Sequence, residues 1–390
     1  MSSVRKRTLP SGETRWLVDY RDSTGTRRAR QFATRKEAVD FETRTRADLQ
    51  GGVCVADAAS VTVADAAELW LVRCESEGLE HSTIIQYRAH VRNHIAPLLG
   101  SQKLSRLTVP AIEAFRDKLV KTRSKALSQK IVTSLKALLK DAMRRGLIRQ
   151  NVATQTRVKI SARHKTKIAI PAKSEIRCLL TKSAEIWPLT KVQVTRQREQ
   201  RIVAVPWRPL IVTALFTGMR LSELRGLTWE YVSFAEGLIK VRQRADFRGV
   251  IGYPKSEAGN RDIPLPPIVI NTLKIWKLAC PNTSGNWVFP GKDGAIPTTK
   301  NVRGQCWLPL LRSLGLTTTE GDVELPKYRF HDLRHVAASL FIEQGMQPKR
   351  VQEIMGHSSI KITFDLYGHL WPKPESDHEA MRQIEERLLS

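Results

Sequence analysis

Cysteine is scarce and scattered in this sequence. The five cysteines are Cys54, Cys74, Cys178, Cys280 and Cys306. Because their number is odd and no two form a Cys-x-x-Cys unit, they indicate neither a disulfide framework nor a zinc site, and they fit reduced thiols in a cytoplasm. A run of about 18 apolar residues is also missing, so we expect no membrane-spanning helix. The basic N-terminus lacks an apolar core behind it and is not a signal peptide.

Acidic residues are outnumbered by basic ones. The 390 residues include 64 Lys and Arg against 38 Asp and Glu, which gives a formal net charge of +26. Such an excess of positive charge indicates which partners the protein binds and says nothing about its fold, because a basic surface attracts polyanions. Nucleic acid is the first partner expected, and an anionic membrane surface is a distant second. The length allows two or three domains, each with its own core.

Residues 1–55 form the first expected domain. The segment at 15–21 alternates apolar and polar side chains over most of its length, as a half-buried strand does, and a second, more basic strand is expected at 26–32. A helix should follow Thr34, which can cap it. The fold expected here is a small β-sheet faced by one helix.

Residues 56–165 change character and become helical. Apolar stripes at helical spacing, the capping residue Thr62 and a stop at Gly100 contribute to a prediction of four helices and hence an all-α domain. Basic residues dominate between positions 116 and 145, and an excess this one-sided favours phosphate contact over a merely solvated face. The candidate DNA-binding residues are Arg116, Lys118, Lys121, Lys125, Lys130, Lys136 and Lys140, with Arg27, Arg28 and Arg30 from the first domain.

The remaining chain, residues 166–390, is expected to form a mixed, mainly α (α+β) domain with a C-terminal tail. The basic stretch at 156–171, which ends at Pro171, is typical of a linker between two lobes. The multidomain fold predicted is therefore a small sheet with a helix, an all-α domain and a mixed domain.

Six side chains in the last domain suit chemistry on a phosphate. They are Arg220 in TGMRLSELRGL, Lys255 in GYPKSEAGNRDIPLP, His331 and Arg334 in HDLRH, His357 in MGHSS and Tyr367 in DLYGHLW. The histidine and arginine of HDLRH are three residues apart and share a face of a helix. A phenol, two imidazoles and fixed cations together offer a nucleophile, proton-transfer groups and charge stabilisation.

These six residues stand in the order and motif context of the tyrosine recombinases, and the chain resembles the phage-type, lambda-like site-specific integrases of that family. The resemblance implies that Tyr367 is the nucleophile, and that Arg220 and Arg334 bind the scissile phosphate with His357. It implies that Lys255 protonates the leaving 5′-oxygen. Free tyrosine ionises near pH 10, so nearby cations and an acceptor are needed for attack at neutral pH.

The resemblance gives two further residues a role. It implies that His331 is the general acid/base beside the tyrosine and that Glu223 supports the site. His335 is then expected to be a core or structural residue. A competing interpretation takes HDLRH as a variant of the HExxH zinc helix. The carboxylate is Asp, Arg334 would place a cation beside the metal, and no third ligand presents itself, so we expect no metal.

By the same resemblance, residues 1–55 are an arm-type DNA-binding domain, 56–165 a helical, SAM-like core-binding domain and 166–390 the catalytic domain. The expected partners are double-stranded DNA at core and arm sites, a homotetramer on DNA, and possible DNA-bending host factors and an excisionase. No cofactor is implied, and the expected location is the bacterial cytoplasm. The stretch 187–206 is an insertion relative to the family, without an assignable role.

The expected activity is site-specific recombination through a 3′-phosphotyrosyl intermediate, which integrates or excises a phage or other mobile element. Two alternatives stay open. One is a recombinase of the dimer-resolution type, which lacks an arm domain, and the other is a DNA-binding regulator whose catalytic site has decayed. The target sequence, the element and the balance of integration against excision do not follow from the sequence, because base readout depends on a few side chains in a groove.

Overall fold

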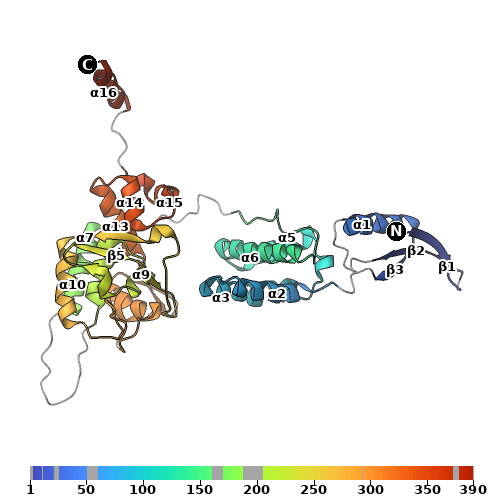
Figure 1. The fold of residues 1–390 in the computed structure, drawn as a ribbon, viewed down its shortest axis with the longest axis horizontal. Coiled ribbons are helices and arrows are strands. Elements are labelled where there is room, and N and C mark those ends of the chain that lie inside the picture. The colour runs from blue at the N-terminus through green and yellow to red at the C-terminus, as the bar shows by residue number, and fades with distance from the viewer. Residues whose placement is uncertain are drawn as a thin grey trace, which may run out of the picture. The chain divides into compact units, whose positions relative to one another are not determined.

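The computed structural model describes residues 3–10, 12–21, 26–50, 60–159, 170–187, 205–291, 293–371 and 377–389. They belong to two compact units, Met1–Lys165 and Thr166–Ser390 (Figure 1). Within these described ranges, no helix is both long enough and apolar enough to cross a membrane.

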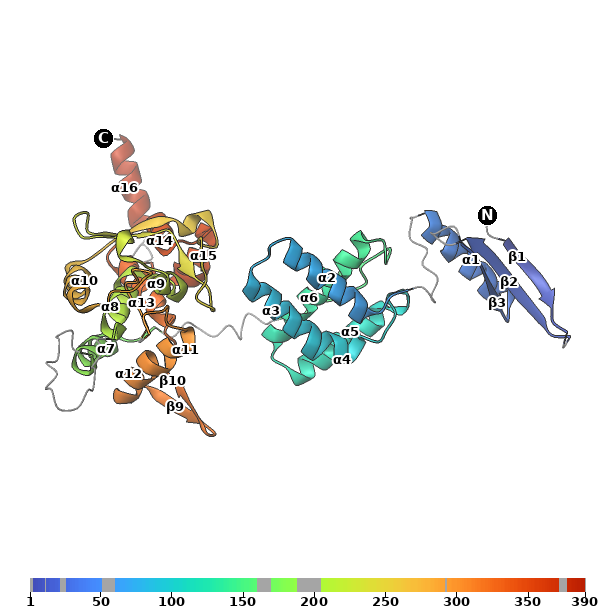
Figure 2. The same cartoon turned by 60° about the horizontal axis from the view of Figure 1, so that its bottom comes forward.

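The first unit begins with an antiparallel sheet in the order β1-β2-β3. Its elements are β1 (Ser3–Thr8), β2 (Thr14–Arg21), β3 (Arg27–Phe32) and helix α1 (Arg35–Gln50), which packs on the sheet (Figure 2). Alternation along β2 buries Val18 and Tyr20, and the Tyr20 ring meets Phe41 of α1 edge-on. Thr34 caps α1, because its hydroxyl accepts from the Glu37 amide while the Glu37 carboxylate accepts from the Thr34 amide.

Helices fill the rest of the first unit. They are α2 (Val63–Ser76), α3 (His81–His90), a π-helical turn (Val91–Ile95), α4 (Ala96–Leu99), a 3-10 turn (Leu104–Arg106), α5 (Val109–Thr122) and α6 (Lys125–Arg144). Their apolar stripes meet in one core that includes Trp70 and Leu135. Buried Asp141 of α6 pairs with Arg73 of α2 at 2.8 Å and with Arg145 at 2.9 Å, which ties the two helices together.

The second unit is mainly helical. Its helices are α7 (Lys173–Ile186), α8 (Trp207–Thr217), α9 (Leu221–Arg225), α10 (Pro267–Ala279), α11 (Thr299–Asn301), α12 (Leu308–Ser313), α13 (Asp332–Glu343), α14 (Pro348–Met355), α15 (Ile360–Tyr367) and α16 (Asp377–Leu389). Shorter turns are Trp229–Tyr231, Glu257–Gly259, Val302–Trp307 and Gly368–Leu370. Helix α8 is apolar on all sides and is therefore central, with α7, α10 and α13 packed around it.

Short antiparallel strands complete the second unit. They are β4 (Val232–Ser233), β5 (Leu238–Val241), β6 (Arg244–Ala245), β7 (Ile251–Gly252), β8 (Arg261–Pro264), β9 (Thr317–Glu320) and β10 (Val323–Pro326). They form a sheet in the order β4-β5-β8 and two separate pairs, β6-β7 and β9-β10. Strand β8 contacts α14, and His357 follows that helix.

The predicted fold class is confirmed, since a small sheet with a helix, a helical part and a mixed, mainly α part follow one another along the chain. The three domain boundaries and the DNA-binding role of each part stay predictions. Most of the proposed linker at 156–171 and of the insertion at 187–206 lies outside the described residues.

Candidate active site

Arg220 is placed by a helix break at Gly218. Helix α8 ends there, with Gly218 in the left-handed conformation (φ 62°), and Arg220 is the N-cap residue of α9. A Cβ at position 218 would lie 2.8 Å from the sulfur of Met355 and 3.2 Å from Cβ of Ala337. Both the backbone conformation and the space require glycine, so this residue fixes the direction in which Arg220 leaves the helix.

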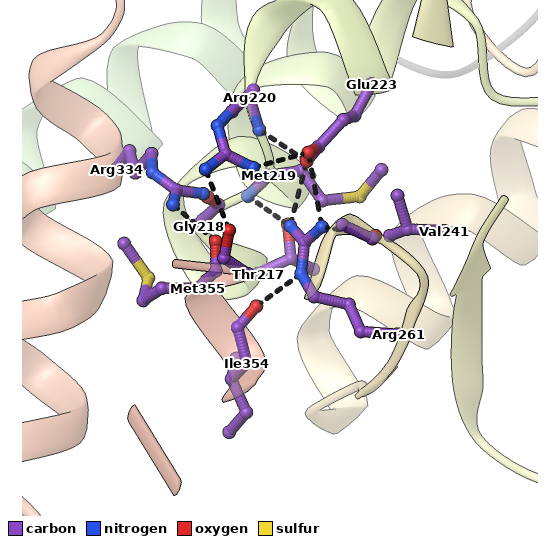
Figure 3. Close-up of polar contacts among 12 residues, drawn as sticks. Thr217, Gly218, Met219, Arg220, Glu223, Val241, Arg261, Arg334, Ile354 and Met355 are labelled. Atoms are coloured by element: carbon purple, nitrogen blue, oxygen red, sulfur yellow. Dashed lines mark hydrogen bonds and ion pairs between the residues drawn. The ribbon is translucent and has the colours of Figure 1, made fainter. Parts of the chain in front are cut away.

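Glu223 is the hub that holds Arg220 (Figure 3). Its carboxylate accepts from the Arg220 amide and from Arg220 Nη1, both at 2.9 Å, and from Arg261 Nη2 at 2.8 Å and Nη1 at 3.2 Å. Only 2% of Glu223 is exposed. Burial alone would raise the pKa of this carboxyl, but the charges and hydrogen bonds of Arg261 and the charge of Arg220 lower it to about 2. It is therefore an anion at every working pH.

Main-chain carbonyls hold the two phosphate-binding candidates. Arg334 donates from Nη1 to the Gly218 oxygen and from Nη2 to the Met355 oxygen, while Arg220 Nη2 donates to the Gly356 oxygen at 2.9 Å (Figure 3). Burial, and then the nearby charge of Arg220, lowers the pKa of Arg334 to about 9. The guanidinium groups outnumber the single Glu223 carboxylate, and this excess of positive charge suits a phosphate.

Tyr367 is the last residue of α15 and only 1% of it is exposed. Its hydroxyl lies 2.7 Å from His335 Nδ1, and its ring is nearly parallel to that of His357 at 6.3 Å between centroids. Burial raises the pKa of Tyr367 to about 12, although the charge of Arg334 opposes this. The buried phenol is therefore protonated at neutral pH.

His357 and His331 border the same region. His357 Nδ1 lies 2.9 Å from Thr363 Oγ1, and burial, followed by the charges of Arg334 and Arg220, lowers the pKa of His357 to about 3. His331 is the residue before α13 and part of its side chain is exposed. Burial of the rest of the side chain, followed by the charge of Arg334, lowers the pKa of His331 to about 4. Both imidazoles are neutral at pH 7 and can donate a hydrogen bond.

Two family models match the chain. The phage integrase family matches residues 194–373, and the phage integrase N-terminal SAM-like domain matches residues 62–120. The XerC-like tyrosine recombinase of Caldanaerobacter subterraneus subsp. tengcongensis is 24% identical over 92% of both chains. The ICEBs1 integrase of Bacillus subtilis is 24% identical over 88% of this chain and 89% of its own. The chain belongs to the phage integrase family of tyrosine recombinases.

Solved structures share the fold of this recombinase. The Tn1549 transposon integrase, in complex with a circular intermediate DNA, has a TM-score of 0.65 at 21% identity and covers 84% of this chain and 99% of its own. A lambda integrase tetramer bound to a Holliday junction has a TM-score of 0.58 at 18% identity and covers 92% and 95%. At these identities the likeness concerns the fold.

The structure brings together most of the residues that the motifs singled out in this recombinase. Arg220, Glu223, Arg334, His357 and Tyr367 are linked through shared contacts and charges. Lys255 is exposed on the segment between β7 and β8. Among the described residues, no group of three or more His, Cys, Asp or Glu could hold a metal ion.

Two residues of the recombinase site have contacts that the motifs did not indicate. Arg261 is not among the residues that the motifs mark, and the sequence leads us to expect a structural role for His335. A usable signal existed for Arg261, because alternation along β8 places it on the buried face with Ile263. For His335 the only signal was its place one turn after His331, which does not indicate its partner Tyr367.

The candidate DNA-binding residues of the helical part differ in their surroundings. The exposed ones are Lys118, Lys121, Lys125, Lys130 and Lys140. Arg116 forms ion pairs with Glu113 and Asp117, and Lys136 donates to the Thr154 oxygen at 3.0 Å. The last two side chains therefore have protein partners that a phosphate would have to replace.

In the N-terminal sheet, the basic candidates lie on β3. Arg27 pairs with Asp19 of β2, and the Arg30 guanidinium lies over the rings of Phe32 and Phe41. Arg28 is half-buried on the same strand. Whether these side chains contact DNA stays a prediction.

Proposed function

We propose that this recombinase cuts and rejoins DNA at specific sites and thereby integrates or excises a phage or other mobile element. The observation that carries the proposal is a buried tyrosine, Tyr367, set beside a positively charged cluster that includes Arg220 and Arg334. This combination supplies a nucleophile and a phosphate clamp on one rigid framework.

In the proposed reaction, Tyr367 Oη attacks the phosphorus of a DNA phosphodiester. A 3′-phosphotyrosyl bond forms while the phenol proton passes to a neighbouring histidine. The bond to the 5′-oxygen breaks, and that oxygen takes a proton from Lys255. Arg220 and Arg334 neutralise the charge that develops on the non-bridging oxygens, and His357 donates to one of them. These donors are already fixed by the protein, so they need little reorganisation at the moment of reaction.

Rejoining uses the same groups in reverse. The 5′-hydroxyl of a partner strand attacks the phosphotyrosyl bond and returns the tyrosine. The energy of the broken phosphodiester is kept in the covalent link, so neither a nucleotide nor a metal is needed. Two pairs of strands must be exchanged, which calls for four protomers on two DNA sites.

Double-stranded DNA is the substrate, in keeping with the DNA complexes named for the Tn1549 and lambda integrases. The exposed lysines of α5 and α6 would bind the phosphates of the core site, and the basic strand β3 would bind a separate arm site. A DNA-bending host factor and an excisionase would set the direction, and the reaction would take place in the bacterial cytoplasm.

The test is covalent capture. A nicked suicide duplex that carries the crossover site of the parent element is incubated with wild type and with Tyr367→Phe in EDTA and without nucleotide. We expect an adduct from wild type only, mapped to Tyr367 by mass spectrometry. A gel shift without an adduct from either protein would favour the decayed regulator, and an adduct that survives Tyr367→Phe would identify another nucleophile.

A further inference from the structure

The Tyr367 hydroxyl has a histidine partner that motif order did not indicate. His335 Nδ1 lies 2.7 Å from Tyr367 Oη. His331, one turn earlier, instead meets the His335 ring edge-on at 5.5 Å between centroids. A general base must lie within hydrogen-bonding reach of the proton that it removes. We propose that His335 is the catalytic base that takes the proton of Tyr367 during DNA cleavage, a role that rests on the function proposed above.

The surroundings of His335 suit a base. Only 7% of the residue is exposed, and α13 fixes it directly after Arg334. Burial lowers the pKa of His335, as do the charges of Arg329 and Arg334, while the Asp332 carboxylate opposes them. The ring is therefore neutral at pH 7. In the tautomer with hydrogen on Nε2, Nδ1 accepts the hydrogen bond from the phenol.

The tyrosine needs such a base. With a pKa of about 12, Tyr367 is ionised in only about one molecule in 10⁵ at pH 7. Attack by the neutral phenol must then be accompanied by proton removal. His357 does not suit this step, because its Nδ1 is bonded to Thr363 and its pKa of about 3 makes it a weak base.

The proton passes from Tyr367 Oη to His335 Nδ1, the Oη–phosphorus bond forms, and the bond from phosphorus to the 5′-oxygen breaks. That oxygen takes a proton from Lys255, which becomes neutral. The new imidazolium lies near the Asp332 carboxylate, which is the charge in its surroundings that favours it. In rejoining, the imidazolium returns the proton to the phenolate.

The test measures the first-order rate of adduct formation on the suicide duplex with all DNA bound, so that affinity does not enter. His335→Gln should lower this rate by about 10²- to 10³-fold. His335→Ala should be slow and should regain part of its rate with added imidazole. His90→Gln is the matched control, because buried His90 makes a similar bond to Ser134 at 2.8 Å in the helical part, and its rate should equal that of wild type.

The pH profile of the wild type decides independently of any variant's folding. The groups around His335 are Asp332, Arg329, Arg334, His331 and Tyr367. The rate should fall toward acid pH, because protonated His335 cannot accept a proton. Since the pKa of His335 is lowered, this fall should lie on the acid side of an ordinary imidazole, and His335→Gln should lack it. A His335→Gln rate equal to or above wild type, or a flat wild-type profile, would overturn the proposal. Loss of the adduct in Tyr367→Phe tests the underlying function separately.

Discussion

Replacing Arg261 tests whether the site depends on a residue outside its motifs. Arg261 is 9% exposed and donates to Glu223 twice, to the Ile354 oxygen at 2.6 Å and to the Gly259 oxygen at 3.0 Å. It therefore joins β8, the end of α14 and the segment that carries Lys255 to the Glu223 hub. Arg261→Met should leave the buried Glu223 carboxylate with Arg220 as its remaining ion-pair partner.

The size of the effect follows from this geometry. Removing one partner of a buried ion pair costs about 3–5 kcal/mol, and the bonds that Glu223 keeps with Arg220 place the loss near about 3 kcal/mol. For a unit of this size that corresponds to a fall in Tm of about 6–12 °C. The first-order cleavage rate should fall about 10- to 100-fold, because Arg220 keeps its charge but loses its fixed orientation.

Thermal unfolding and adduct formation at saturating enzyme measure the two effects. Arg242→Met is the matched control, since Arg242 lies after β5 and pairs with exposed Asp262, so it should lose less than about 1 kcal/mol. In a double-mutant cycle, the loss of unfolding free energy in the double variant Glu223→Gln, Arg261→Met should be smaller than the sum of the losses in the two single variants. Additive losses, or an Arg261→Met protein as stable as the control, would refute the inference that Arg261 stabilises the site through Glu223.

Three further predictions concern single residues. Gly356→Ala places a Cβ 2.9 Å from two neighbouring atoms at φ 63°, so its Tm should fall further than that of Gly345→Ala, where φ is 77° but the space is open. Asp141→Ala leaves two arginines of the helical part without their buried carboxylate, so unfolding should be easier by about 3 kcal/mol, with unchanged cleavage once DNA is bound. The pKa of His357 is about 3 in the folded protein against 6.5 in the unfolded chain, so the protein becomes less stable as the pH drops below 6.5. Denaturant titrations should show that wild type loses about 2 kcal/mol more of its unfolding free energy than His357→Asn does between pH 7 and pH 5.

The sequence sufficed for the order and type of most elements because their signals are local. Thr34 and Thr62 cap helices that the apolar pattern also indicates, and Gly218 breaks a helix because its conformation and its space both demand glycine. Arg220, Glu223 and Arg334 could be named for the same reason, since short motifs mark them.

The links between these motifs could not be predicted, because they depend on contacts between distant segments. Arg261 reaches Glu223 across 38 positions and Ile354 across 93. His331 and His335 share one turn of α13, so periodicity treats them alike. The position of Tyr367 at the end of α15 decides that His335, and not His331, forms the hydrogen bond with the phenol.

Arg220 and Arg334, for which we propose phosphate binding, also complete the ends of helices. The last carbonyls of a helix lack partners within it and carry partial negative charge. Arg334 donates to the oxygen of Gly218, which ends α8, and to that of Met355, the last residue of α14, while Arg220 donates to the Gly356 oxygen just beyond it. Both glycines are left-handed, which turns these carbonyls toward the guanidinium groups. The protein therefore holds these two guanidinium groups in place with its own backbone, as the phosphate-binding role that we propose for them requires.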